Sequence, residues 1–155
     1  MIKKIKPETF HLLSTTFYGK HECFAKLSEE IVELQQAIYN NDLENITEEM
    51  ADVEICIPYL EKIMPASQDE YRIESCDRKI DFKDSSDMLL QAIGLYKKYN
   101  DIKAVVDLCS RSTQLMCHAL YYLYKDYKIS PHLVDDIKDF KKKRTILRRI
   151  GRGDN

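Results

Sequence analysis

Residues 28–55 read SEEIVELQQAIYNNDLENITEEMADVEI, and this stretch decides the fold. On each side of its centre, apolar residues recur at steps of three and four, which is the period of one face of an α-helix. The run NND at residues 40–42 separates the two patterns and supplies turn and capping chemistry. We therefore predict two helices that pair as an antiparallel hairpin over residues 19–64, called the first hairpin below.

Four acidic residues of the first hairpin are arranged as two level pairs. Glu30 and Asp52 each lie eleven residues from Asn41. Glu33 and Glu49 each lie eight residues from the same asparagine. Within each helix the two acids are three positions apart, so they share a face within about 5 Å of axis. Because both pairs flank the apolar faces, we expect the four carboxylates to converge beside the core.

We call these four residues the acid cluster. Like charges at the edge of a core repel each other and raise their own pKa values unless a cation neutralises them. Oxygen ligands without histidine or cysteine suit Mg²⁺, with Mn²⁺ as the alternative. A solvated helix face is the competing interpretation and would suffice for one acid pair. Two level pairs favour a metal site.

The middle of the chain predicts a second hairpin. Residues 65–85 are polar and weakly patterned, so we expect a connection that contains a short helix. Ser85 or Ser86 is the predicted N-cap of the next helix. That helix and a longer one, separated by the turn residues Asn100 and Asp101, form a second hairpin over residues 86–127.

Two further helices complete the predicted bundle. Pro7 suits the first turn of a helix that ends near Gly19. A serine followed by Pro131 begins a last helix over residues 131–150. The expected fold class is all-α: an antiparallel helical bundle built from two helical hairpins plus N- and C-terminal helices. We expect a single domain over residues 1–155.

The composition agrees with one helical domain. With 155 residues and 44% apolar composition, the chain can bury a core, and four glycines and four prolines leave little turn chemistry for a sheet. Five cysteines, an odd number without a CxxC motif, predict reduced thiols in a cytoplasmic protein. No apolar run has the length of a signal peptide core or a membrane span, so we expect no membrane contact.

The stretch SEEIVEL, followed after a short loop by TEEMADVEI, resembles the EExxE and ExxD signature of the all-α nucleoside triphosphate pyrophosphatases. This superfamily includes MazG-like proteins, dimeric dUTPases and phosphoribosyl-ATP pyrophosphohydrolase, and the similarity covers about residues 17–64. The resemblance implies that the acid cluster holds Mg²⁺. It also implies that a nucleoside triphosphate is cleaved between its α and β phosphates, and that chains pair into a dimer or tetramer.

The resemblance also suggests which acids act on water. Glu29 is the first acid of EExxE, where it can add a ligand or orient a water molecule. A carboxylate that is not fully engaged by metal can accept the proton of the attacking water as general base. Glu29 and Glu33 are the candidates for this catalytic role.

In MazG-like sequences the segment before the acids helps to hold the base, and here it reads FYGKHECFAKL. Phe17, Tyr18 and His21 are the predicted base-stacking residues. Packing at a helix junction is the alternative for the two aromatic residues, and plain exposure for the histidine. Cys23 stands where the resemblance leads us to expect glutamine.

The second hairpin carries no equivalent of the acid cluster. A shift of 59 or 60 residues along the chain finds no acid at any of the four positions. We interpret residues 86–127 as a degenerate repeat that closes the bundle over one metal site, with Arg111 near the phosphates. Ordinary bundle packing is the alternative.

The C-terminal helix is basic, with eight bases and one acid over residues 138–152. Lys141, Arg144 and Arg148 fall close together on one helical face and are predicted to bind the triphosphate. A solvated basic face, contact with nucleic acid or membrane, and an acidic partner protein are the alternatives.

The leading hypothesis is a cytoplasmic, Mg²⁺-dependent nucleoside triphosphate pyrophosphohydrolase that releases a nucleoside monophosphate and pyrophosphate. The alternative is a non-catalytic helical binding module that uses its basic C-terminal helix to hold nucleic acid or a protein partner. The expected partners are a nucleoside triphosphate and further copies of the chain, with no membrane and no nucleic acid.

Overall fold

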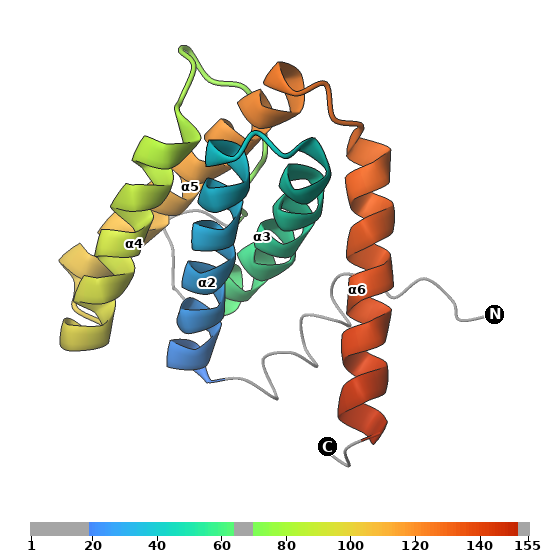
Figure 1. The fold of residues 1–155 in the computed structure, drawn as a ribbon. Coiled ribbons are helices and arrows are strands. Elements are labelled where there is room, and N and C mark those ends of the chain that lie inside the picture. The colour runs from blue at the N-terminus through green and yellow to red at the C-terminus, as the bar shows by residue number, and fades with distance from the viewer. Residues whose placement is uncertain (1–18, 64–69, 152–155) are drawn as a thin grey trace.

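The computed structural model describes residues 19–63 and 70–151, and within these residues the fold is all-α, as predicted. Figure 1 shows α2 and α3 side by side, with α4 and α5 on one side of them and α6 on the other. None of the described helices has both the length and the apolar content to cross a membrane. The helix predicted from Pro7 onwards falls outside the described residues. The helices are α2 (Lys20–Tyr39), α3 (Leu43–Ile63), α4 (Phe82–Tyr99), α5 (Lys103–Asp126) and α6 (Pro131–Gly151).

The first hairpin is formed by α2 and α3, which pack against each other. Asn41 lies at the turn with φ of 52°, in the left-handed region that asparagine tolerates better than most residues. Asp42 then accepts a hydrogen bond from the backbone N–H of Asn45 at 3.3 Å and caps α3. Burial of each large apolar side chain between the helices contributes about 2 kcal/mol. Those with no exposed surface are Phe24, Leu27, Ile31, Leu34, Ile46, Met50, Val53 and Leu60.

The second hairpin begins earlier than predicted, and the cap predicted at Ser85 or Ser86 is wrong. Helix α4 starts at Phe82, and the side chain of Asp81 caps it by accepting a hydrogen bond from the N–H of Asp84 at 3.0 Å. The two serines lie inside the helix, where both hydroxyls donate back to the carbonyl of Phe82. Phe82 is buried, so packing of this ring selects the earlier of two chemically suitable caps.

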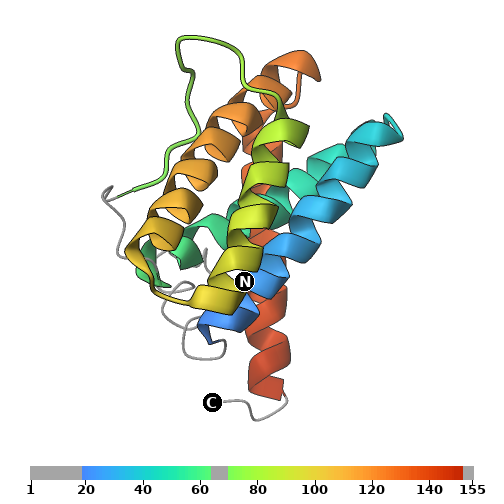
Figure 2. The same ribbon diagram turned by 90° about the vertical axis from the view of Figure 1, so that its left-hand side faces the viewer.

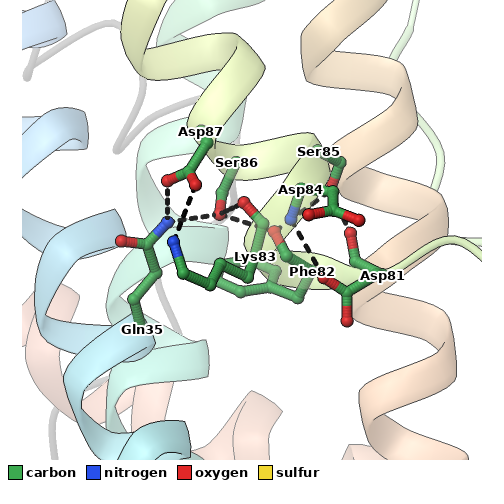
Figure 3. A network of polar contacts seen from close by, with 8 residues as sticks. All are labelled: Gln35, Asp81, Phe82, Lys83, Asp84, Ser85, Ser86 and Asp87. Atoms are coloured by element: carbon green, nitrogen blue, oxygen red, sulfur yellow. Dashed lines mark hydrogen bonds and ion pairs between the residues drawn. The ribbon is translucent and has the colours of Figure 1, made fainter.

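A polar network joins the two hairpins, as Figure 3 shows. The side-chain amide of Gln35 on α2 donates to Ser86 Oγ and to Asp87 Oδ1 on α4, each at 2.8 Å. Lys83 donates to the other oxygen of Asp87, also at 2.8 Å. The network fixes the position of α4 along α2.

The connection before α4 contains no helix within residues 70–81, so the predicted short helix is not found there. Residues 64–69 are outside the described ranges. The connection is instead held by side chains of α5. Gln114 donates to the carbonyl of Arg72 at 3.0 Å, and the hydroxyl of Tyr122 donates to the carbonyl of Cys76 at 3.1 Å.

Helix α6 packs against α3, and the two helices run in the same direction in Figure 1. A buried polar contact joins them, because Lys138 on α6 donates to Glu54 on α3 at 3.1 Å. Tyr124 on α5 donates to the other oxygen of the same carboxylate. Burial raises the pKa of Glu54 despite the opposing effects of Lys138 and Tyr124. Glu54 is therefore the point where α3, α5 and α6 meet.

Candidate metal centre

The two helices of the first hairpin bring the acid cluster together. Helix α2 positions Glu30 and Glu33, and α3 positions Glu49 and Asp52. One carboxylate oxygen from each of the four lies within 4.8 Å of the others. The level arrangement expected from the distances to Asn41 is therefore present. The role of these residues as metal ligands remains a prediction.

Two oxygens of the acid cluster are buried without a hydrogen-bond partner in the described part of the chain. They are Oε2 of Glu30 and Oε2 of Glu49. Glu30 is 5% exposed, so water has little access to it. A buried acceptor without a donor costs about 1–3 kcal/mol, and more when it is charged. Such an arrangement needs a proton or a cation at this position.

The raised pKa values of two glutamates in the cluster also indicate that a proton or a cation is required there. Burial, the charge of Asp52 and a hydrogen bond with Glu33 together raise the pKa of Glu49 to about 8. Burial also raises the pKa of Glu30, although Lys26 acts in the opposite direction. Without a cation, the cluster therefore holds a proton more tightly than an ordinary glutamate does.

Two lysines border the acid cluster. Lys26 Nζ lies 2.8 Å from Glu30 Oε1, one turn away on the same helix. Lys141 Nζ reaches across from α6 and lies 2.8 Å from both oxygens of Asp52. Lys141 also lies 3.2 Å from Glu48. These contacts leave Oε2 of Glu30 and Glu49 without donors, so an all-oxygen set remains that fits Mg²⁺ or Mn²⁺.

Lys26 and Glu48 were not singled out by the sequence analysis, although a signal for each was present. Lys26 precedes Glu30 by four residues, and Glu48 precedes Asp52 by four. Residues at this spacing are neighbours on a helix surface. Both could therefore have been assigned to the border of the site.

The structure separates the two candidate general bases. Glu33 is an exposed member of the acid cluster. Glu29 is exposed as well, but it does not belong to the cluster, and its carboxylate lies 3.8 Å from Lys26. Glu33 is thus the candidate that adjoins both the other acids and solvent.

Of the predicted base-stacking residues, the structure describes only His21, which does not lie beside the acids. His21 is exposed near the start of α2, with its ring centroid 5.6 Å from that of Tyr96. It precedes Glu30 by nine residues, which corresponds to about 13 Å along the helix. Phe17 and Tyr18 lie outside the described residues.

The predicted phosphate-binding residues divide into one near and three more distant side chains. Lys141 contacts the acid cluster, whereas Arg144 and Arg148 are exposed further along α6. Arg111 is exposed on α5. Figures 1 and 2 show α4 and the beginning of α5 on the side of the first hairpin away from α6, whereas the end of α5 approaches α6. The structure therefore brings only one of the four basic residues to the cluster.

Comparison with known families gives a match that covers the acid cluster. The model of the phosphoribosyl-ATP pyrophosphohydrolase family matches residues 2–59, more than a third of the chain. No curated protein and no solved structure matches this chain. The matched family supports a pyrophosphohydrolase type of activity in general. Because it is one of the families of the all-α nucleoside triphosphate pyrophosphatase superfamily, the match confirms the resemblance carried by the first hairpin.

Proposed function

We propose that this protein is a Mg²⁺-dependent nucleoside triphosphate pyrophosphohydrolase that releases a nucleoside monophosphate and pyrophosphate. The observation that carries the proposal is the convergence of four carboxylates, two of which keep a buried oxygen that has no donor within the part of the chain that the structure describes. The match to the phosphoribosyl-ATP pyrophosphohydrolase family supports it.

The acid cluster would hold the metal, with all four carboxylates contributing oxygen ligands. Bound Mg²⁺ would neutralise charge on the phosphates and lower the pKa of the attacking water. Mn²⁺ would serve as a substitute, because it accepts the same oxygen ligands.

Glu33 is the better candidate for the general base. A base must reach both water and the reacting phosphate, and Glu33 is the exposed member of the cluster. Glu29 remains the alternative; it is exposed, and its carboxylate lies 3.8 Å from Lys26 Nζ.

The two lysines would complete the neutralisation of the triphosphate. Lys141 is held between Asp52 and Glu48, so its ammonium group already lies where a phosphate bound to the cluster would arrive. Lys26 occupies the corresponding place beside Glu30. An ammonium group is a compact point charge that suits phosphate oxygens. Arg144 and Arg148 would act on the substrate at longer range, through the positive field of α6.

The proposal is tested by measuring pyrophosphate release from a panel of canonical and modified nucleoside triphosphates. The reaction is run with Mg²⁺, with Mn²⁺ and with a chelator. Release that requires a divalent ion supports the proposal. No release from any substrate, together with no binding of Mn²⁺ observed by electron paramagnetic resonance, would overturn it and favour the non-catalytic binding module.

Dimer or tetramer formation remains a prediction from the resemblance. Light scattering of the purified chain, with and without Mg²⁺, measures it directly.

A further inference from the structure

A groove of about 850 Å³ lies between the beginning of α3 and the part of α6 from Leu133 to Arg144. Its volume falls within the range of small-molecule sites, about 300–1,000 Å³. The proposed function gives this groove no role, and neither does the family match. It is lined by Leu43, Glu44, Thr47, Glu48, Leu133, Asp136, Ile137, Phe140, Lys141 and Arg144.

The groove leads directly to the acid cluster. Lys141 and Glu48 line it, and Lys141 also binds both oxygens of Asp52. On α3, residues Glu44, Glu48 and Asp52 succeed each other at intervals of four and therefore share one face. From Glu44 to Asp52 this face extends about 12 Å along the helix. A ligand anchored at the cluster can therefore extend into the groove without crossing a helix.

The groove exposes flat and apolar surface. Phe140 is 64% exposed, and Leu43 and Leu133 are each more than half exposed. The guanidinium of Arg144 lies 5.6 Å from the centroid of the Phe140 ring. An aromatic ring and a guanidinium plane are the surfaces on which nucleobases stack.

The charges of the groove are distributed as a nucleotide requires. The cation Lys141 lies at the end beside the acid cluster, where phosphates would be, and Arg144 lies over the Phe140 ring. Glu44 and Asp136 add carboxylates, which are acceptors for the N–H groups at the edge of a base. A nucleotide has the same polarity, with anionic phosphates at one end and an N–H-bearing aromatic ring at the other.

We propose that this groove is the binding site for the nucleoside part of the substrate, with Phe140 as the stacking platform. The inference rests on the proposed function, because it assumes that the triphosphate binds at the acid cluster. It places the base between α3 and α6 and not beside the start of α2, where His21 lies. Phe140 then determines nucleotide affinity without touching the reacting phosphates.

The test compares two ligands that differ by the nucleoside. One is the α,β-imido analogue of each common ribonucleoside triphosphate, which resists cleavage between the α and β phosphates. The other is inorganic tripolyphosphate, which has no base. Binding of both with Mg²⁺ is measured by calorimetry for the wild type, for Phe140→Ala and for Leu147→Ala. Leu147 is a matched control, because it is 53% exposed on the same helix but does not line the groove.

We expect Phe140→Ala to weaken binding of the imido nucleotides by about tenfold, the effect of removing an aromatic platform from a base. Tripolyphosphate affinity should stay unchanged, and Leu147→Ala should change neither ligand. If both ligands bind the wild type and Phe140→Ala changes neither or both equally, the groove is not the nucleoside site, although the proposed function stands. If neither ligand binds the wild type, the proposed function itself is overturned.

A second copy of this chain is the competing occupant of the groove. Light scattering of the same variants distinguishes it. A change of oligomeric state in Phe140→Ala with unchanged nucleotide affinity would identify the groove as a subunit contact and overturn the inference.

Discussion

The middle of the first hairpin and the middle of the second differ in what they place between their helices. In the first hairpin, four carboxylates converge within 4.8 Å. The equivalent positions of the second hairpin, 59 or 60 residues later in the chain, are taken almost entirely by apolar or small side chains. Those with at most 1% exposure are Leu89, Ala92, Ile93, Cys109 and Ser112.

The comparison shows two uses of one scaffold. In the second hairpin, these positions are mainly apolar and their burial stabilises the fold by about 25 cal/mol per Å² of apolar surface, although the hydroxyl of Ser112 is buried without a partner among the described residues. In the first hairpin, the same positions carry buried carboxylate oxygens that have no donor among the described residues, and a glutamate whose pKa is raised to about 8. The first hairpin is therefore locally less stable than it would be with apolar residues at these positions, and the carboxylates provide a charged site instead.

The largest effect is expected from introducing an acid into the second hairpin. Ile93→Asp should destabilise the protein by about 4 kcal/mol or more, because the new carboxylate is buried without a cation. Urea unfolding followed by circular dichroism measures the change. Leu95→Asp is the control on the same helix, since Leu95 is 40% exposed, and it should cost less than about 1 kcal/mol. Equal effects at both positions would show that a buried carboxylate at position 93 costs no more stability than an exposed one at position 95.

The reverse change, removing charge from the first hairpin, should abolish function while preserving the fold. Glu33→Gln and Asp52→Asn should each reduce pyrophosphate release by more than about a hundredfold, since changes beyond the direct ligands already reach that size. Helical circular dichroism should be retained. Glu22→Gln is the control, because Glu22 is exposed on α2 and lies outside the cluster. Turnover that survives either cluster variant would refute the ligand assignment.

The stability of the metal-free protein should depend on pH through the first hairpin. The pKa of Glu49 rises from an ordinary value near 4.5 to about 8 on folding, so the folded chain holds this proton more tightly. The free energy of unfolding should therefore fall as pH rises from about 4.5 to about 8. Thermal unfolding with a chelator should show the midpoint dropping by a few degrees over this range. Glu49→Gln should flatten the profile, as should saturating Mg²⁺, and an unchanged profile in the variant would exclude Glu49 as its source.

The smallest effect is expected at the junction between the hairpins. Gln35→Ala removes two hydrogen bonds from α2 to α4 and should destabilise the protein by about 1 kcal/mol. Gln36→Ala, at an exposed neighbouring position, should change stability by less than about 0.5 kcal/mol. Thermal unfolding of the two variants is the measurement. Similar losses would mean that the hairpins are held together by their apolar contacts alone.

Local sequence signals were sufficient where neighbours along the chain determine the structure. The turn at Asn41 and the alignment of the acid cluster follow from helical periodicity and turn chemistry, and both are present. The N-cap of α4 could not be predicted in this way, because Asp81 and the two serines offer similar chemistry and burial of Phe82 decides between them.

The features that could not be predicted from the sequence depend on contacts between segments that are distant along the chain. The connection at residues 70–81 contains no helix, because its backbone finds partners on α5, about 40 residues further along the chain. The basic face of the last helix was predicted from spacing, but its rotation about its own axis was not. Val134 is fully buried and Lys138 contacts Glu54, so packing directs Lys141 towards Asp52 and leaves Arg144 and Arg148 outside.

The buried contact at Glu54 has a consequence for how the chain can be divided. Glu54 lies within residues 2–59, the part matched by the family model, but its partners Tyr124 and Lys138 both lie far outside it. A fragment limited to the matched segment would keep every acid of the cluster and lose both donors to Glu54. A carboxylate freed in this way must become exposed to water or neutralised, and either change alters the surroundings of α3 two residues from Asp52. The smallest autonomous unit that can carry the site is therefore larger than the matched segment, and it extends at least into the C-terminal helix.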